Sequence, residues 1–224
     1  MTTLILAIAL MLGIGQNGAA PAGRFDMVVR TDFFAGFAGD EARLKKGMET
    51  CEQILAADPR HAEALVWHGA GLLFQGGMAF AAGNPQRGGE LFGRGVEEMN
   101  RAVALEPENV GVLIPQAAVL LVATRNMPPD AARPLIEQAV GNYEKVLTIQ
   151  ASYFSTLGDH PKGELLFGLA EGYSRLGKPE LARRYFERLI KDAPESGQAP
   201  RARTWLDTGS IPKTEGVGCI GCHK

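Results

Sequence analysis

The 224-residue chain has few cysteines and no excess of charge of either sign. It contains three cysteines, 23 Lys and Arg against 25 Asp and Glu, and a net charge of −2. Because basic and acidic residues are interspersed, the sequence offers no patch that would attract nucleic acid or an anionic lipid surface. Only one long apolar run occurs, at the N-terminus, which argues against a membrane-spanning protein.

The sequence also lacks the residue groupings of a hydrolase or a transferase. It has no Ser/His/Asp grouping, no carboxylate pair and no His-x-x-x-His spacing. Two of its four histidines, His61 and His160, are expected at solvated helix starts, and His68 is expected as a buried imidazole with hydrogen-bond partners. We therefore predict that the protein is not an enzyme.

The strongest chemical signal is the C-terminal run Cys219-Ile220-Gly221-Cys222-His223. A Cys-x-x-Cys-His run is the pattern for covalent attachment of a c-type haem. Cys219 and Cys222 would each bond one vinyl group of the porphyrin, and His223 would ligate the iron through its imidazole. The motif predicts one covalent haem c, with His223 as the metal ligand.

Three other interpretations of the motif exist: a terminal disulfide, a redox-active Cys-x-x-Cys, and half of a zinc site. Zinc needs a second ligand pair, and the remaining cysteine, Cys51, has no histidine at ligand spacing. A thioredoxin-type motif lies between a strand and a helix, whereas this one follows a Gly-rich stretch. The disulfide remains the alternative to haem.

An apolar run at Leu4–Ile14 has the length of a signal-peptide core and is too short to span a bilayer. Small residues follow, so we expect cleavage after Ala20 or Ala22, and the α-amino group is the only cation before the run. No cysteine lies near this region, so a lipid anchor is not indicated. The sequence thus predicts a signal peptide over residues 1–22 and export to the bacterial periplasm or the extracellular space. The resemblance to c-type cytochromes implies that haem is joined to Cys-x-x-Cys-His motifs outside the cytoplasmic membrane.

Residues 163–196 resemble a tetratricopeptide repeat. Leu166, Leu169, Ala170 and Tyr173 share one face of a first predicted helix. Gly177 marks the turn, and the second predicted helix carries Ala182, Phe186 and Leu189 before Pro194 ends the unit. The resemblance implies an all-α fold, a right-handed solenoid of antiparallel helix pairs.

The same register recurs upstream with more divergence. One helix pair is expected over residues 62–105. Residues 76–89 make it longer than a usual repeat, so they should form a protruding loop or lengthened helix ends. Another helix pair is expected over 110–125 and 131–149, with a kink at Pro115. An incomplete first repeat ends at Pro59, and its first segment, 24–37, is interrupted by glycine. A short helix at 200–206 caps the array. We thus expect about 3.5 repeats over residues 24–206, their scattered glycines allowing close helix packing.

The large apolar side chains at helical spacing are interpreted as core and not as a cofactor site. The aromatic ones are Trp67, Phe74, Phe92, Phe167, Tyr173 and Phe186. The methionines Met48, Met78, Met99 and Met127 are expected to fill gaps between helices.

Residues 207–224 are interpreted as a linker tail that carries the attachment motif but cannot cover a porphyrin. Three functions follow as hypotheses. The protein is an exported repeat scaffold that transfers electrons through its haem, or a scaffold that binds a protein or self-assembles into a ring or filament, with the terminal cysteines as a disulfide or cross-link. The third hypothesis is a haem enzyme that acts, for instance, on peroxide. The sequence supplies no dedicated residues for the distal side of such a haem.

Overall fold

The computed structural model describes residues 24–211; the predicted leader and the Cys219–His223 motif lie outside this range. The described part is all-helical and has no strand, which confirms the all-α prediction. Among its helices, none is both long and apolar enough to cross a membrane. The α-helices are α1 (Asp26–Phe37), α2 (Glu41–Ala57), α3 (Ala62–Ala81), α4 (Pro85–Leu105), α5 (Val110–Ala123), α6 (Pro129–Ile149), α7 (Asp159–Arg175), α8 (Pro179–Asp192) and α9 (Ala199–Thr208), and a 3-10 helix spans Phe154–Thr156.

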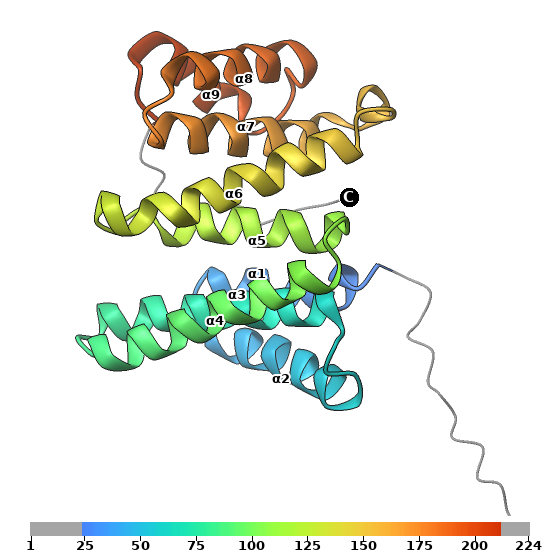
Figure 1. Ribbon diagram of the computed structural model, residues 1–224, viewed down its shortest axis with the longest axis vertical. Coiled ribbons are helices and arrows are strands. Elements are labelled where there is room, and N and C mark those ends of the chain that lie inside the picture. The colour runs from blue at the N-terminus through green and yellow to red at the C-terminus, as the bar shows by residue number, and fades with distance from the viewer. Residues whose placement is uncertain (1–23, 212–224) are drawn as a thin grey trace, which may run out of the picture.

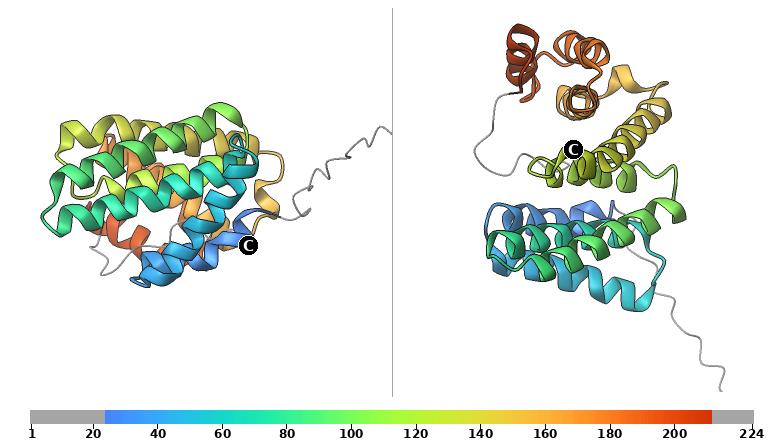
Figure 2. Two further views of the ribbon diagram at one scale, coloured as in Figure 1. Left: turned by 90° about the horizontal axis from the view of Figure 1, so that it is seen from below. Right: turned by 60° about the vertical axis from the view of Figure 1, so that its left-hand side comes forward.

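The helices stack along the long axis of the molecule, from α2 at one end to α8 and α9 at the other (Figure 1). The same order is seen from another side in Figure 2. The extensive contacts all join helices that are adjacent, or next but one, in the chain. Short connections make the partners of each pair antiparallel, and one apolar core runs through the whole stack.

The α3–α4 pair is the longest, and it explains the glycine-rich stretch at residues 76–89. This stretch forms lengthened helix ends joined by the short turn Ala82–Asn84, which is one of the two forms expected from the sequence. Asn84 caps α4 by accepting a hydrogen bond from the amide of Arg87 at 3.1 Å. Met78 and Phe80 lie on the extended end and are 38% and 48% exposed, so the prediction that Met78 fills a core gap was wrong. This end of α3 extends past the helices that would have covered it.

The α7–α8 pair buries the apolar positions that the sequence placed on one face of each helix. Leu166, Ala170, Ala182 and Phe186 are completely buried. Gly177 has φ +73° in the turn between the two helices, a conformation that favours glycine. Beyond them, α9 covers the end of the pair as predicted. The Trp205 ring lies 4.8 Å from that of Phe186, and Trp205 Nε1 donates to Ser174 Oγ at 3.0 Å.

Two segments that contain helix-disfavouring residues are nevertheless helical. The glycine-interrupted segment forms α1, where Gly36 faces α2 so closely that a Cβ there would lie 2.5 Å from Leu44 Cβ. Likewise, α5 continues through Pro115, which is itself buried. In both cases burial against neighbouring helices outweighs weak local helix propensity.

Candidate functional site

The predicted haem-attachment residues Cys219, Cys222 and His223 lie outside the residues that the structure describes. The third cysteine, Cys51, is completely buried in α2 and belongs to the core. Burial, with the charges of Glu52 and Glu98, raises the pKa of its thiol to about 12. Within residues 24–211, no group of three or more His, Cys, Asp or Glu side chains could hold a metal ion.

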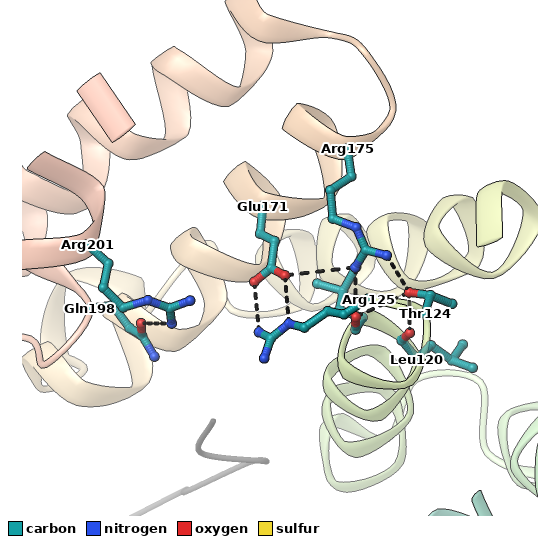
Figure 3. Close-up of polar contacts among 8 residues, drawn as sticks. Leu120, Thr124, Arg125, Glu171, Arg175, Gln198 and Arg201 are labelled. Atoms are coloured by element: carbon teal, nitrogen blue, oxygen red, sulfur yellow. Dashed lines mark hydrogen bonds and ion pairs between the residues drawn. The ribbon is translucent and has the colours of Figure 1, made fainter. Parts of the chain in front are cut away.

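A polar network that joins several helices surrounds Glu171, a residue of α7 that is only 5% exposed (Figure 3). Arg125, just after α5, donates from Nε and Nη2 to the two carboxylate oxygens of Glu171, each at 3.3 Å. Arg175, one turn further along α7, places Nη1 3.8 Å from Glu171 Oε1. The forked guanidinium group of Arg125 thus matches the planar carboxylate.

Arg175 also ties α7 to the end of α5. Its Nη1 donates to the carbonyl oxygen of Leu121 at 2.7 Å, and its Nη2 donates to Thr124 Oγ1 at 2.8 Å. The Thr124 hydroxyl in turn donates to the carbonyl oxygen of Leu120 at 2.7 Å. These contacts satisfy the backbone acceptors at the C-terminal end of α5, where a helix leaves its last carbonyl groups without helical partners.

A second polar group, formed by Arg201 of α9 and Gln198 just before that helix, lies on the side of Glu171 away from Arg175 in Figure 3. Arg201 Nη1 donates to Gln198 Oε1 at 2.8 Å, and Gln198 Nε2 donates to Glu164 Oε1 of α7 at 2.8 Å. The Arg201 guanidinium lies over the ring of Phe167, 4.2 Å from its centre. Its Nε is buried and has no hydrogen-bond partner within the described part of the chain.

Burial shapes the protonation of these groups. It lowers the pKa of Arg175 and of Arg201, a shift that the charge of Glu171 opposes and that of Arg125 reinforces. For Glu164, burial raises the pKa, and the hydrogen bond from Gln198 counteracts it. We name the surface formed by Arg125, Glu171, Arg175 and Arg201 the arginine face. It combines three cations with one buried carboxylate.

A cavity of about 300 Å³ opens between α2, α3 and α4, with His68 among its lining residues. His68 Nδ1 is 2.5 Å from Glu98 Oε2, and Nε2 is 3.5 Å from Glu52 Oε1. Burial disfavours the charged imidazole, but the hydrogen bond and charge of Glu98, reinforced by Glu52, outweigh it and raise the pKa of His68. The prediction of a buried histidine with partners is confirmed. Because both acidic and basic side chains line the cavity, it does not define one class of ligand.

The other histidines and the aromatic residues have structural positions. His61 caps α3, with Nδ1 accepting from the amide of Ala64 at 3.1 Å, and its ring packs against Phe25. His160 lies in the first turn of α7. The predicted core aromatics Trp67, Phe167, Tyr173 and Phe186 are buried, and Phe74 and Phe92 pack against the core from partly buried positions.

Sequence reasoning did not identify the arginine face. Glu171 and Arg175 are spaced one helical turn apart, which could have indicated a pair. Arg125 and Arg201 are distant from them in sequence, and only the stacking of α5, α7 and α9 brings the residues together. No protein-family model matches this chain, and no curated protein matches it. A functional proposal therefore depends on the residues of the chain itself.

Proposed function

We propose that this protein is an exported scaffold of tetratricopeptide-like helix pairs that carries one covalent haem c and transfers electrons to or from a protein partner. Cys219 and Cys222 hold the porphyrin through thioether bonds, and His223 ligates the iron. The observation that carries the proposal is the complete Cys-x-x-Cys-His motif in a chain that begins with an apolar, signal-like run. Bound haem supplies one-electron chemistry, and the protein supplies the partner-binding surface and the surroundings of the porphyrin.

Two features of the described residues support the repeat assignment. The positions that define a tetratricopeptide repeat in residues 163–196 are buried between α7 and α8, and Gly177 occupies the turn. The extensive contacts join nearby helices along the stack, as expected for a solenoid in which each unit packs on its neighbours. A right-handed superhelix with a partner-binding groove is the form that we propose for the array.

The residues available around the array also suit a porphyrin with two carboxylate groups. Arg201 has a buried Nε without a partner in the described structure, and the charge of a second arginine, Arg125, acts on it. Arginine side chains bind carboxylates through paired hydrogen bonds. The described part of the chain therefore contains side chains of the type that binds such carboxylate groups.

The test is expression of the full chain in a bacterial host that matures cytochromes c, followed by absorbance spectroscopy and acid-acetone extraction. The expected result is a c-type haem spectrum whose chromophore stays with the polypeptide after extraction. Cys219→Ser and Cys222→Ser should reduce attachment, while Cys51→Ser should leave it unchanged. Absence of haem, or complete extraction of it from the wild-type protein, would establish the disulfide interpretation instead.

A second candidate function, self-assembly or protein binding without redox chemistry, is favoured by one observation. Met27 and Val28 on α1 are 56% and 52% exposed, although both side chains are large and apolar. An exposed apolar surface on α1, the first described helix, is suited to contact with another molecule. Light scattering of the full chain and of a Val28→Lys variant tests this: a larger mass that is lost in the variant supports assembly through α1, and equal monomer masses contradict it.

A further inference from the structure

His68 joins three helices through the two nitrogens of one buried imidazole ring. The ring belongs to α3, and its contacts reach the helix on either side. Nδ1 lies 2.5 Å from Glu98 Oε2 of α4, and Nε2 lies 3.5 Å from Glu52 Oε1 of α2. A protonated imidazole is a donor at both nitrogens, so it attracts both carboxylates at once.

Loss of one proton affects the two contacts of His68 unequally. A neutral imidazole keeps one N–H and has a lone pair on the other nitrogen, so it can donate to one carboxylate only. The Glu98 contact is the shorter, and the Glu98 side chain is 22% exposed against 60% for Glu52, so water competes less for it. The remaining proton therefore stays on Nδ1. Nε2 then presents a lone pair to the Glu52 carboxylate, and the attraction between α2 and α3 at this point is replaced by repulsion.

The other charged groups around the cavity come from the same two neighbouring helices. Each cation there has a carboxylate partner: Lys45 with Glu49 at 3.6 Å, Arg87 with Glu90 at 3.7 Å, and Arg94 with Glu98 at 3.9 Å. Cys51 of α2 has a pKa of about 12 and stays a thiol. Among the described residues, Glu98 and Glu52 supply the principal charges that raise the pKa of His68, and α1 and α5, which also contact α3, supply none of these. His68 is thus the group of this cluster suited to change its charge near neutral pH.

We propose that His68 is a pH-dependent switch for the attachment of α2: its protonated ring holds α2 to the α3–α4 pair, and loss of one proton loosens α2 while the contact with α4 remains. The packing makes α2 the helix that responds. Among the described helices, α3 and α4 share the most extensive interface, and α2 contacts α3 far less extensively. The cavity of about 300 Å³ lies between α2, α3 and α4, so packed side chains do not replace the lost contact. α2 also lies at the end of the stack, where a helix can loosen without disturbing the rest (Figure 1).

Hydrogen–deuterium exchange of the full chain, measured by mass spectrometry on peptides from residues 41–57, tests the switch. Protection is expressed relative to the unfolded chain at the same pH, which removes the pH dependence of the exchange chemistry. We expect the protection of α2 to fall about three- to fivefold from below pH 6.5 to mildly alkaline buffer, the size expected for an ion pair with one exposed partner. Peptides from α8 and α9 should not change, because these helices can open without breaking the His68 contacts.

Two matched variants identify the contact responsible. Glu52→Gln should remove the pH dependence of α2, because a side-chain amide at this position can accept from the protonated ring or donate to the neutral one. The control is Glu49→Gln. Glu49 lies about one turn earlier on α2, lines the same cavity, is similarly exposed and pairs with Lys45 instead of His68. Circular dichroism and thermal unfolding establish that both variants fold.

The outcomes decide the proposal without reference to haem, so it and the proposed function stand or fall separately. A fall in α2 protection that occurs in the wild-type protein and in Glu49→Gln, and is absent from Glu52→Gln, supports the switch. An equal fall in both variants overturns it, since the pH dependence then does not pass through Glu52. The switch is also overturned if wild-type α2 is equally protected at both pH values, or if its protection changes only together with that of α8 and α9.

Discussion

Gly69 in α3 and Gly95 in α4 lie against each other's backbone. A Cβ at Gly69 would be 2.7 Å from the carbonyl oxygen of Gly95, and a Cβ at Gly95 would be 2.5 Å from the carbonyl oxygen of Gly69. Real Cβ atoms do not approach other atoms so closely. The two glycines therefore set the distance between α3 and α4, the longest helix pair of the stack.

Alanine at Gly69 should separate these helices. We expect Gly69→Ala to lower the free energy of unfolding by about 2 kcal/mol, because overlap with the α4 backbone outweighs the better helix propensity of alanine. Gly93→Ala is the control: Gly93 lies in α4, and no heavy atom is within 4 Å of its Cβ position. It should raise the free energy of unfolding by about 0.5–1 kcal/mol. Urea unfolding measures both, and equal stability of the two variants would contradict the argument.

Removing the charge of Glu171 should leave two guanidinium groups without their shared carboxylate. We expect Glu171→Gln to lower the free energy of unfolding by about 3 kcal/mol, since breaking a largely buried ion pair strands the remaining charges. Glu187→Gln, at an exposed position of α8, should change it by less than about 0.5 kcal/mol. Denaturant titrations at low and high salt test this, and a Glu171→Gln protein as stable as Glu187→Gln would rule out a stabilising role for the network.

The stability contributed by His68 should depend on pH. Its pKa is raised in the folded protein by Glu98 of α4 and Glu52 of α2, against the effect of burial. The contribution is therefore fully present below the ordinary pKa of 6.5 and is lost as pH rises through the higher, folded value. His68→Gln should cost about 1.5–3 kcal/mol at low pH, where it removes a charged hydrogen bond, and less at high pH.

The control for His68 is Glu98→Gln, which removes the principal charge that holds the imidazole protonated. Thermal or urea unfolding across a pH series compares the wild-type protein with both variants. In Glu98→Gln, the decline in stability above pH 6.5 should be much smaller than in the wild-type protein. A constant difference between wild type and His68→Gln at all pH values would show that His68 does not titrate in the folded protein as described.

Cys51 should be chemically inert while the protein is folded. Because its thiol is buried and has a pKa of about 12, alkylation at about pH 8 should be on the order of a thousandfold slower than in urea-unfolded protein. The experiment uses a Cys219→Ser/Cys222→Ser variant, in which Cys51 is the remaining cysteine, and mass spectrometry counts the adducts. Rapid labelling without denaturant would show that α2 opens readily or that Cys51 is accessible.

The helices were predictable from sequence because each carries its apolar residues at helical spacing. Leu166, Ala170 and Tyr173 of α7 illustrate this, since a face that is apolar in sequence becomes a face buried in the fold. For α1 the same reasoning was weaker, because glycine lowers helix propensity. The reason for Gly36 appears only when α2 is packed on it: the Leu44 side chain occupies the space that a Cβ would need.

The arginine face was beyond sequence reasoning for a different reason. Arg125 and Glu171 are 46 residues apart, and no local pattern couples them. Their contact depends on how α5 and α7 are stacked, which is a property of three-dimensional packing. By contrast, the Cys-x-x-Cys-His motif is local, and the sequence alone suffices to predict its chemistry.

The linear arrangement of contacts also determines how the protein responds to tension. Since the extensive contacts join only nearby helices, a pull applied between α1 and α9 passes through the helix interfaces one after another. We expect such a series of interfaces to lengthen by a small rotation at each interface. Every interface then bears the same load. The α3–α4 pair, whose backbones approach at Gly69 and Gly95, has the most extensive interface of the described helices, so we expect it to yield last.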